Sequence, residues 1–182
     1  MTASDSTGSN EGLFRRLARR AGHAVPSPST VIFGSAGWGL LLAIAAMVGI
    51  WTHNRLIVAN PYAIAAVYFY GGSLAFAPAL WLARLVLDGR GSLARLAGAS
   101  IIMAVTAHLV TAAVFALQYR VFYSHWHADF PQIVWFFQLA FTSAGAGYTF
   151  TVGSLAYYWP FSCLAFIGFG LWFARRGSAK AH

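Results

Sequence analysis

Residues 31–51 read VIFGSAGWGLLLAIAAMVGIW, a run of 21 residues that contains no charged side chain. An α-helix rises about 1.5 Å per residue, so this run is long enough to cross a hydrocarbon core of about 30 Å. The run is longer than the apolar part of a cleavable signal peptide, and thirty residues precede it. We therefore expect a transmembrane helix here, and an integral membrane protein as the fold class.

Three further apolar runs, at 61–83, 96–119 and 150–173, are each long enough for one crossing. Of the 182 residues, 59% are hydrophobic and only 9% are charged, whereas soluble domains carry about 25% charged residues. So little charge cannot cover the surface of a water-soluble globule. The sequence therefore predicts an all-α integral membrane protein with about four transmembrane helices. Its parts would be a tail at 1–30, a membrane domain at 31–174 and a second tail at 175–182.

The basic residues indicate which helix ends face the cytoplasm, because Lys and Arg accumulate in cytoplasmic loops. The chain has twelve basic residues against four acidic ones, a formal net charge of +8. With four crossings and a cytoplasmic N-terminus, only Arg55 and Arg120 fall on the outer side. The other ten would be cytoplasmic: Arg15, Arg16, Arg19, Arg20, Arg84, Arg90, Arg95, Arg175, Arg176 and Lys180. We therefore predict that both termini are cytoplasmic, and we expect lipid rather than nucleic acid beside these residues.

The stretch 130–174 contains no charge and could hold one crossing or two. Gly and Ser interrupt its apolar character in SAGAGYTFTVGS at 143–154. Two crossings would place the basic C-terminus outside, against the charge rule. We therefore favour four spans, with 130–146 as an aromatic interfacial or re-entrant segment before the last helix. A fifth crossing at 130–149 is the alternative.

A short basic amphipathic helix is predicted at 11–22, EGLFRRLARRAG. Its apolar residues recur at helical spacing, and arginines fill the other positions, which suits a helix lying on an anionic leaflet. The lipid-surface residues would be Arg15, Arg16, Arg19 and Arg20. Eleven of the twelve basic residues are Arg, which together with much Ala and Gly is typical of a GC-rich bacterial genome, so we expect a bacterial inner membrane.

One candidate metal site lies on the predicted outer side, in SHWHADF at 124–130. His125, His127 and Asp129 alternate, so in an extended chain their side chains point the same way. His53, just past the first span, falls on the same side. Three imidazoles and a carboxylate would suit Zn²⁺ or Cu²⁺. The alternative is that these residues are polar loop residues at a wet interface.

His108 lies close to the centre of the third predicted span, where an ionisable side chain is rare and by default suggests a function. It could relay protons or ions, or bind a buried cofactor. Alternatively, a neutral His108 donates one hydrogen bond to a neighbouring helix.

Three functions remain open. The sequence favours a non-enzymatic accessory subunit of a larger transport, secretion or respiratory-type membrane assembly, because nucleotide-binding and hydrolase motifs are missing. Small residues could pack its helices on other subunits or on a second copy: Gly71, Gly72, Gly168 and Gly170. The alternatives are a small homo-oligomeric transporter or channel, and a membrane metalloprotein or redox enzyme with the outer His/Asp site.

Overall fold

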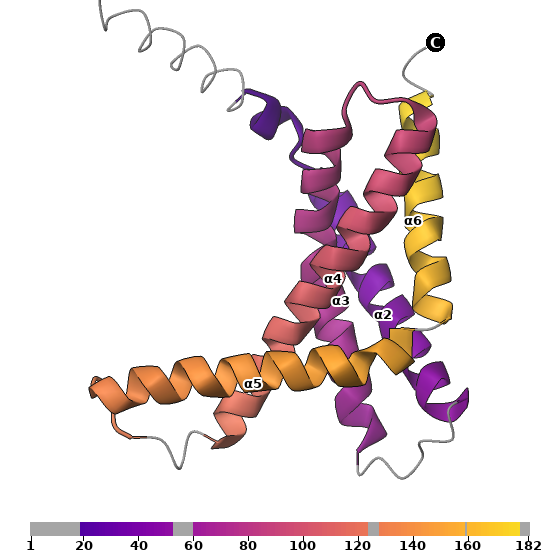
Figure 1. Cartoon of the computed structure of the whole chain (residues 1–182). Helices are drawn as coiled ribbons and strands as arrows, with labels where there is room; N and C mark the ends of the chain where they lie inside the picture. Colours follow the sequence, from indigo (N-terminus) through magenta and orange to yellow (C-terminus); the bar gives the residue numbers. More distant parts are fainter. Residues whose placement is uncertain (1–18, 53–59, 124–127, 159, 179–182) are drawn as a thin grey trace, which may run out of the picture.

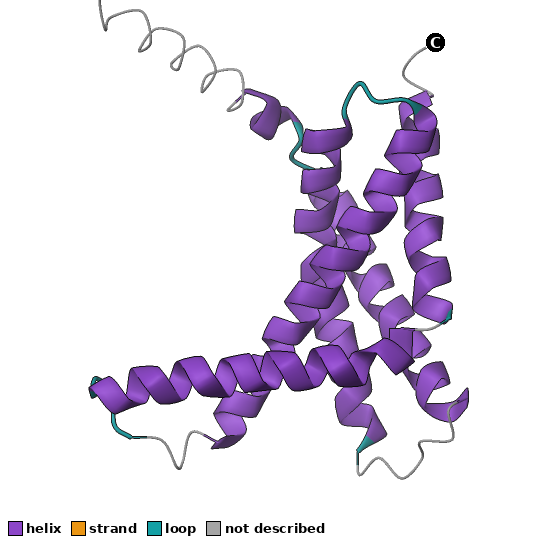
Figure 2. Ribbon diagram, viewed as in Figure 1, coloured by secondary structure: helices purple, strands orange, loops and turns teal. Residues whose placement is uncertain are grey.

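The structure, a computed structural model, describes residues 19–52, 60–123, 128–158 and 160–178. These residues are helical or form turns and loops, and no strand occurs among them (Figure 2). The helices are α2 (Pro28–Thr52), α3 (Pro61–Leu87), α4 (Ser92–Tyr123), α5 (Ile133–Tyr158) and α6 (Phe161–Ser178). A short helical segment at 19–23 precedes α2.

Four helices, α2, α3, α4 and α6, run along one axis as a bundle, and α5 lies across them near one end (Figure 1). α2 packs on α3, α3 on α4, and α4 on α6. Within the described ranges, three helices are long and apolar enough to cross a membrane, namely α2, α3 and α4. This is the arrangement expected of a multi-pass membrane protein.

The helix boundaries follow from local sequence. Pro28 begins α2 and Pro61 begins α3, and proline suits the first turn because its missing N–H has no partner there anyway. The Asn60 side chain accepts a hydrogen bond from the Ala63 N–H, 3.0 Å, and so caps α3. After α3 the chain turns at Gly89, whose φ of 72° favours glycine.

The expected single helix over 150–173 was wrong. Residues 133–158 form one continuous helix, α5, which passes through the Gly- and Ser-rich stretch, and α6 starts only at Phe161. Pro160 separates them, because proline lacks an N–H and disfavours the helical conformation of the residue before it. α6 has 18 residues and ends with Arg175 and Arg176 in its last turn, so its apolar part is short.

The core lies where the four bundle helices meet. Its most buried large side chains include Leu42, Tyr68, Leu80 and Met103, and Phe169 of α6 packs against the same cluster. The core therefore draws on all four helices, as the contact between their apolar faces requires.

Glycines allow two of the helix crossings to be close. A Cβ atom at Gly71 would lie 2.6 Å from the Thr111 Cα, so α3 and α4 approach to backbone contact here. A Cβ at Gly170 of α6 would collide with the Leu96 carbonyl oxygen of α4. Around Gly168, by contrast, there is open space. Gly71 and Gly170 thus pack helices within this chain, as small residues commonly do in membrane bundles.

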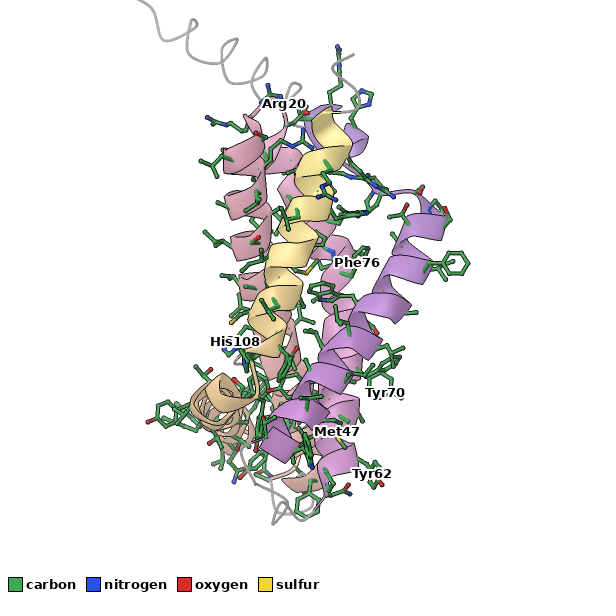
Figure 3. The ribbon with its side chains drawn as sticks, turned by 90° about the vertical axis from the view of Figure 1, so that its right-hand side faces the viewer. Arg20, Met47, Tyr62, Tyr70, Phe76 and His108 are labelled. Atoms are coloured by element: carbon green, nitrogen blue, oxygen red, sulfur yellow. The ribbon has the colours of Figure 1, made fainter. Side chains whose placement is uncertain are left out.

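The described arginines lie mostly at one end of the bundle, which we call the basic end. α2 and α4 begin there, and α3 and α6 finish there (Figure 1). Figure 3 shows Arg20 at this end and Tyr62 at the opposite one. The described arginines of the basic end are Arg19, Arg20, Arg84, Arg90, Arg95, Arg175 and Arg176. Arg120, in the last turn of α4, lies toward the opposite end, which we call the α5 end.

Candidate functional site

The predicted metal site falls largely outside the described residues. His53, His125 and His127 belong to that part of the chain. Asp129 is exposed, and its backbone carbonyl accepts a hydrogen bond from the Gln132 N–H, 3.0 Å. No group of three or more His, Cys, Asp and Glu residues that could hold a metal ion occurs within the described ranges. The Zn²⁺ or Cu²⁺ site therefore stays a prediction.

The predicted lipid-surface arginines are described in part. Arg15 and Arg16 lie outside the described ranges, whereas Arg19 and Arg20 are exposed on the helical segment at 19–23. This segment is attached to α3, because the Trp81 indole N–H donates to the Ala21 carbonyl over 3.1 Å. Arg19 and Arg20 thus lie at the basic end of the bundle, beside the start of α2.

His108 lies where α4 crosses α5, and Figure 3 shows it at the level of α5. Its Nε2 is 3.2 Å from the hydroxyl oxygen of Thr151 on α5. Its ring lies against two aromatic rings, with centroid distances of 5.5 Å to Phe150 and 5.8 Å to Tyr158. The hydrogen bond to a neighbouring helix, one of the two roles considered for His108, is therefore present.

Buried hydroxyl groups gather beside His108, at the junction of α3, α4 and α5. Thr111 is fully buried and donates to the Ala107 carbonyl over 2.6 Å. Tyr68 and Tyr158 pack ring to ring, with a centroid distance of 5.4 Å. Both of their hydroxyl groups are buried without a hydrogen bond of good geometry to any described residue, and the Ser154 hydroxyl lies beside Tyr68 and the Thr111 hydroxyl beside Tyr158. Buried polar groups in proteins are usually hydrogen-bonded, so these two donors mark an unusual site.

A cavity of about 930 Å³ opens between α3, α4 and α5, next to these hydroxyls. α3 contributes its first two turns, α4 its last turns, and α5 its second half. Ser154, buried beside Tyr68, lines the same cavity. The remaining lining residues are Ala63, Ile64, Val67, Val114, Phe115, Leu117, Gln118, Tyr119, Val121, Phe122, Thr149, Phe150, Gly153 and Tyr157.

The cavity is apolar along its walls, and its polar groups are few and uncharged. The exposed side chains of Gln118 and Thr149 form part of its lining, and the buried Tyr68 and Ser154 form another part. Pockets of about 300–1,000 Å³ with apolar walls and a few polar groups hold small molecules in many proteins. The cavity is open on the side of the exposed Leu117, Val121 and Phe122, so it can hold part of a lipid-soluble molecule and offer it hydrogen bonds.

Sequence reasoning found His108 but not the cavity. Tyr68 looked like one more aromatic residue in an apolar run, and Ser154 like part of a Gly- and Ser-rich interruption. The sequence signal that could have pointed to the cavity was a tyrosine and a serine inside uncharged runs, because buried hydroxyl groups in a membrane domain need hydrogen-bond partners. Their proximity depends on α5 lying across the bundle, which no local pattern predicts.

Comparison with protein-family models, curated protein sequences and solved structures finds no match for this chain.

Proposed function

We propose that this chain is a non-enzymatic inner-membrane protein that binds a lipid-soluble molecule and serves as an accessory subunit of a larger membrane assembly. The observation that carries the proposal is the cavity of about 930 Å³ beside the buried Tyr68 hydroxyl. Apolar walls favour a lipid-soluble ligand, because burying apolar surface is the main driving force for binding in such pockets.

The proposal includes an orientation. The arginines of the basic end support a cytoplasmic location for that end and for both termini. The α5 end and the cavity would then lie on the outer side of the membrane. α5, which runs across the bundle, would lie in the outer leaflet, and its many aromatic side chains suit that depth.

Blocking the cavity tests ligand binding. Gly153 lines the cavity, and a Cβ atom there would meet no other atom within 4 Å. Gly153→Leu should therefore place a branched side chain in the part of the cavity beside Ser154 and obstruct binding there, while leaving the fold intact. Gly145, on the same helix and also surrounded by open space, does not line the cavity, so Gly145→Leu is the matched control.

The experiment is extraction of the three proteins in a mild detergent, followed by mass spectrometry of the small molecules that copurify. We expect a lipid-soluble compound in stoichiometric amount with the unmodified protein and with Gly145→Leu, and its loss from Gly153→Leu. Equal small-molecule content in all three proteins would contradict binding in this cavity.

In the proposed accessory role, the contact with another subunit is made by the face of α5 that points away from the bundle. Ala146, Phe150 and Ser154 of α5 are buried on the bundle. On the opposite face, by helical spacing, Phe141 and Tyr148 are 75% and 72% exposed. In the proposed role, a membrane helix of another subunit packs on this exposed aromatic face.

Site-specific photo-crosslinking in intact cells tests this contact. A crosslinking residue at Phe141 or Tyr148 should join this chain to one other membrane protein. The same residue at Leu74 of α3, which is 62% exposed, is the control for unspecific contacts. Crosslinks only between copies of this chain would instead favour the homo-oligomeric transporter. Crosslinks to lipid alone would contradict a subunit contact at α5.

A further inference from the structure

The lining of the cavity points to the class of molecule that it holds. We propose that the ligand is a flat, uncharged, lipid-soluble ring that carries a carbonyl oxygen, as isoprenoid quinones do. This inference rests on the proposed function, since it specifies the ligand of the same cavity. Three features of the lining support it: its aromatic rings, its buried Tyr68 hydroxyl and the lack of charge on its described residues.

Aromatic side chains make up a large share of the cavity lining. Phe115 of α4 and Phe150 of α5 stand on adjoining walls, with ring centroids 5.7 Å apart and planes inclined by 37°. Tyr157 adds an edge-on contact to Tyr68, with a centroid distance of 6.4 Å. Aromatic rings gain from stacked or edge-to-face contact with another flat ring. A saturated acyl chain would fill the same space without this gain.

The buried donor is the Tyr68 hydroxyl. Tyr68 lines the cavity and is only 2% exposed, and its hydroxyl lies beside the Ser154 hydroxyl without a hydrogen bond of good geometry to any described residue. A buried donor without an acceptor is costly, and a ligand that supplies an acceptor removes that cost. A ring carbonyl accepts hydrogen bonds and donates none, which matches this group.

Access to this hydroxyl requires a small movement. The Tyr68 oxygen has almost no exposed surface, and the rings of Phe150 and Tyr157 pack against the Tyr68 ring. Tyr157 is only half-buried and lies toward the cavity. A turn of this ring would let the ligand carbonyl reach the Tyr68 hydroxyl. Side-chain rearrangements of this size are common on ligand binding.

Charge limits the choice of ligand. None of the described residues that line the cavity is charged, and the polar side chains that are exposed in its lining, Gln118, Tyr119 and Thr149, are neutral. A carboxylate or phosphate inside such a cavity would lose its hydration without gaining an opposite charge. A fatty acid or phospholipid headgroup is therefore disfavoured against a neutral carbonyl compound.

Native mass spectrometry of the purified full-length protein in detergent can measure the binding of defined probes. The first probe is decylubiquinone, which has a flat ring with carbonyl groups and a ten-carbon chain. The second is decylbenzene, with a ring but no carbonyl, and the third is 1-decanol, with neither ring nor carbonyl. We expect one decylubiquinone per chain, and at least tenfold weaker binding of each of the other two probes.

Three variants, one of them a control, connect this binding preference to individual residues. Tyr68→Phe keeps the ring and removes the hydroxyl, so it should weaken decylubiquinone binding about fivefold, as the loss of one net hydrogen bond implies, and leave decylbenzene unaffected. Tyr70→Phe, on the same helix but 58% exposed, should change neither affinity. Gly153→Leu should weaken the binding of all three probes, because its side chain takes up part of the cavity.

The outcomes separate the ligand class from ligand binding itself. If 1-decanol binds as tightly as decylubiquinone and both bind more weakly to Gly153→Leu, the cavity holds lipid-soluble molecules and the proposed class is wrong. Equal binding of decylubiquinone to Tyr68→Phe and to the unmodified protein would overturn the hydrogen bond to Tyr68. If no probe binds, both the class and the proposed binding function fail.

Discussion

His108 of α4 and Thr151 of α5 are joined by a hydrogen bond of 3.2 Å between Nε2 and Oγ1. The Thr151 hydroxyl also lies 2.8 Å from the Gly147 carbonyl, which can only accept. When its single proton goes to Gly147, its oxygen accepts from His108, whose neutral ring then carries its proton on Nε2. The bond thus ties the crosswise helix to the bundle, next to the buried hydroxyls.

Removing this bond should loosen α5 by a small amount. His108→Phe keeps a ring against Phe150 and Tyr158. Thr151→Val keeps the shape of threonine. Each variant should therefore lose about 0.6 kcal/mol of stability, which is the average for such hydrogen bonds between helices in a membrane protein. Denaturation in mixed micelles can measure this loss. The double variant should lose little more than either single variant, whereas fully additive losses would show that the two groups act independently.

Gly71→Ala should be strongly destabilising. The added methyl group would lie 2.6 Å from the Thr111 Cα, so α3 and α4 would have to move apart at their closest approach. Overpacking of this kind costs about 1–3 kcal/mol. Gly168→Ala places the same methyl group in open space on α6 and should leave the thermal unfolding temperature unchanged or raised. Equal unfolding temperatures for the two variants would contradict the close crossing.

Arg95 should hold the end of α6. Its guanidinium donates to the Phe173 carbonyl over 3.2 Å and lies 4.9 Å from the centroid of the Phe173 ring. Arg95→Leu should therefore increase hydrogen exchange in the last turn of α6. Arg95→Lys keeps the charge but loses the planar group, so it should restore protection only in part. Unchanged exchange in Arg95→Leu would mean that this contact does not hold the helix end.

Arg120 should fix the first half of α5, which extends past the end of α4 (Figure 1). Its guanidinium carbon lies 4.7 Å from the centroid of the Trp135 ring, a cation–π contact of about 0.5–2 kcal/mol. Arg120→Gln should raise hydrogen exchange in the first turns of α5 without changing its second half. Arg90→Gln, at the exposed turn after α3, provides the control. Identical exchange patterns in the two variants would count against this role of Arg120.

The extent to which the fold could be predicted depended on the length of uncharged runs. The runs containing Trp38, Gly71 and His108 each lie within a single helix, because length and lack of charge are enough to predict a segment that crosses a bilayer. The same rule did not work for residues 130–174, because this single uncharged stretch contains α5 and most of α6, and the two helices run in different directions. Glycines at 145, 147 and 153 do not break α5, because glycine only lowers helix propensity by about 1 kcal/mol, whereas Pro160 follows the end of α5 because proline lacks the N–H that a helix needs.

The candidate site was predictable only for residues whose chemistry is rare in a membrane. His108 was found because an ionisable side chain in the middle of an apolar run is uncommon. Tyr68, Ser154 and Gly153 are ordinary residues of apolar runs, and they become a site only when α5 crosses α3 and α4. The predicted grouping of His53 with His125 concerns residues outside the described ranges and stays a prediction.

Reporters placed at four positions in living cells test the membrane arrangement most directly. With both termini cytoplasmic and α5 in the outer leaflet, reporters before residue 19, at Gly91 and after His182 should be active only in the cytoplasm. A cysteine at Ala128, in a Cys163→Ser background, should react with an impermeant thiol reagent from outside. A cytoplasmic reporter before residue 19 combined with an external one after His182 would require an odd number of crossings and would contradict the account.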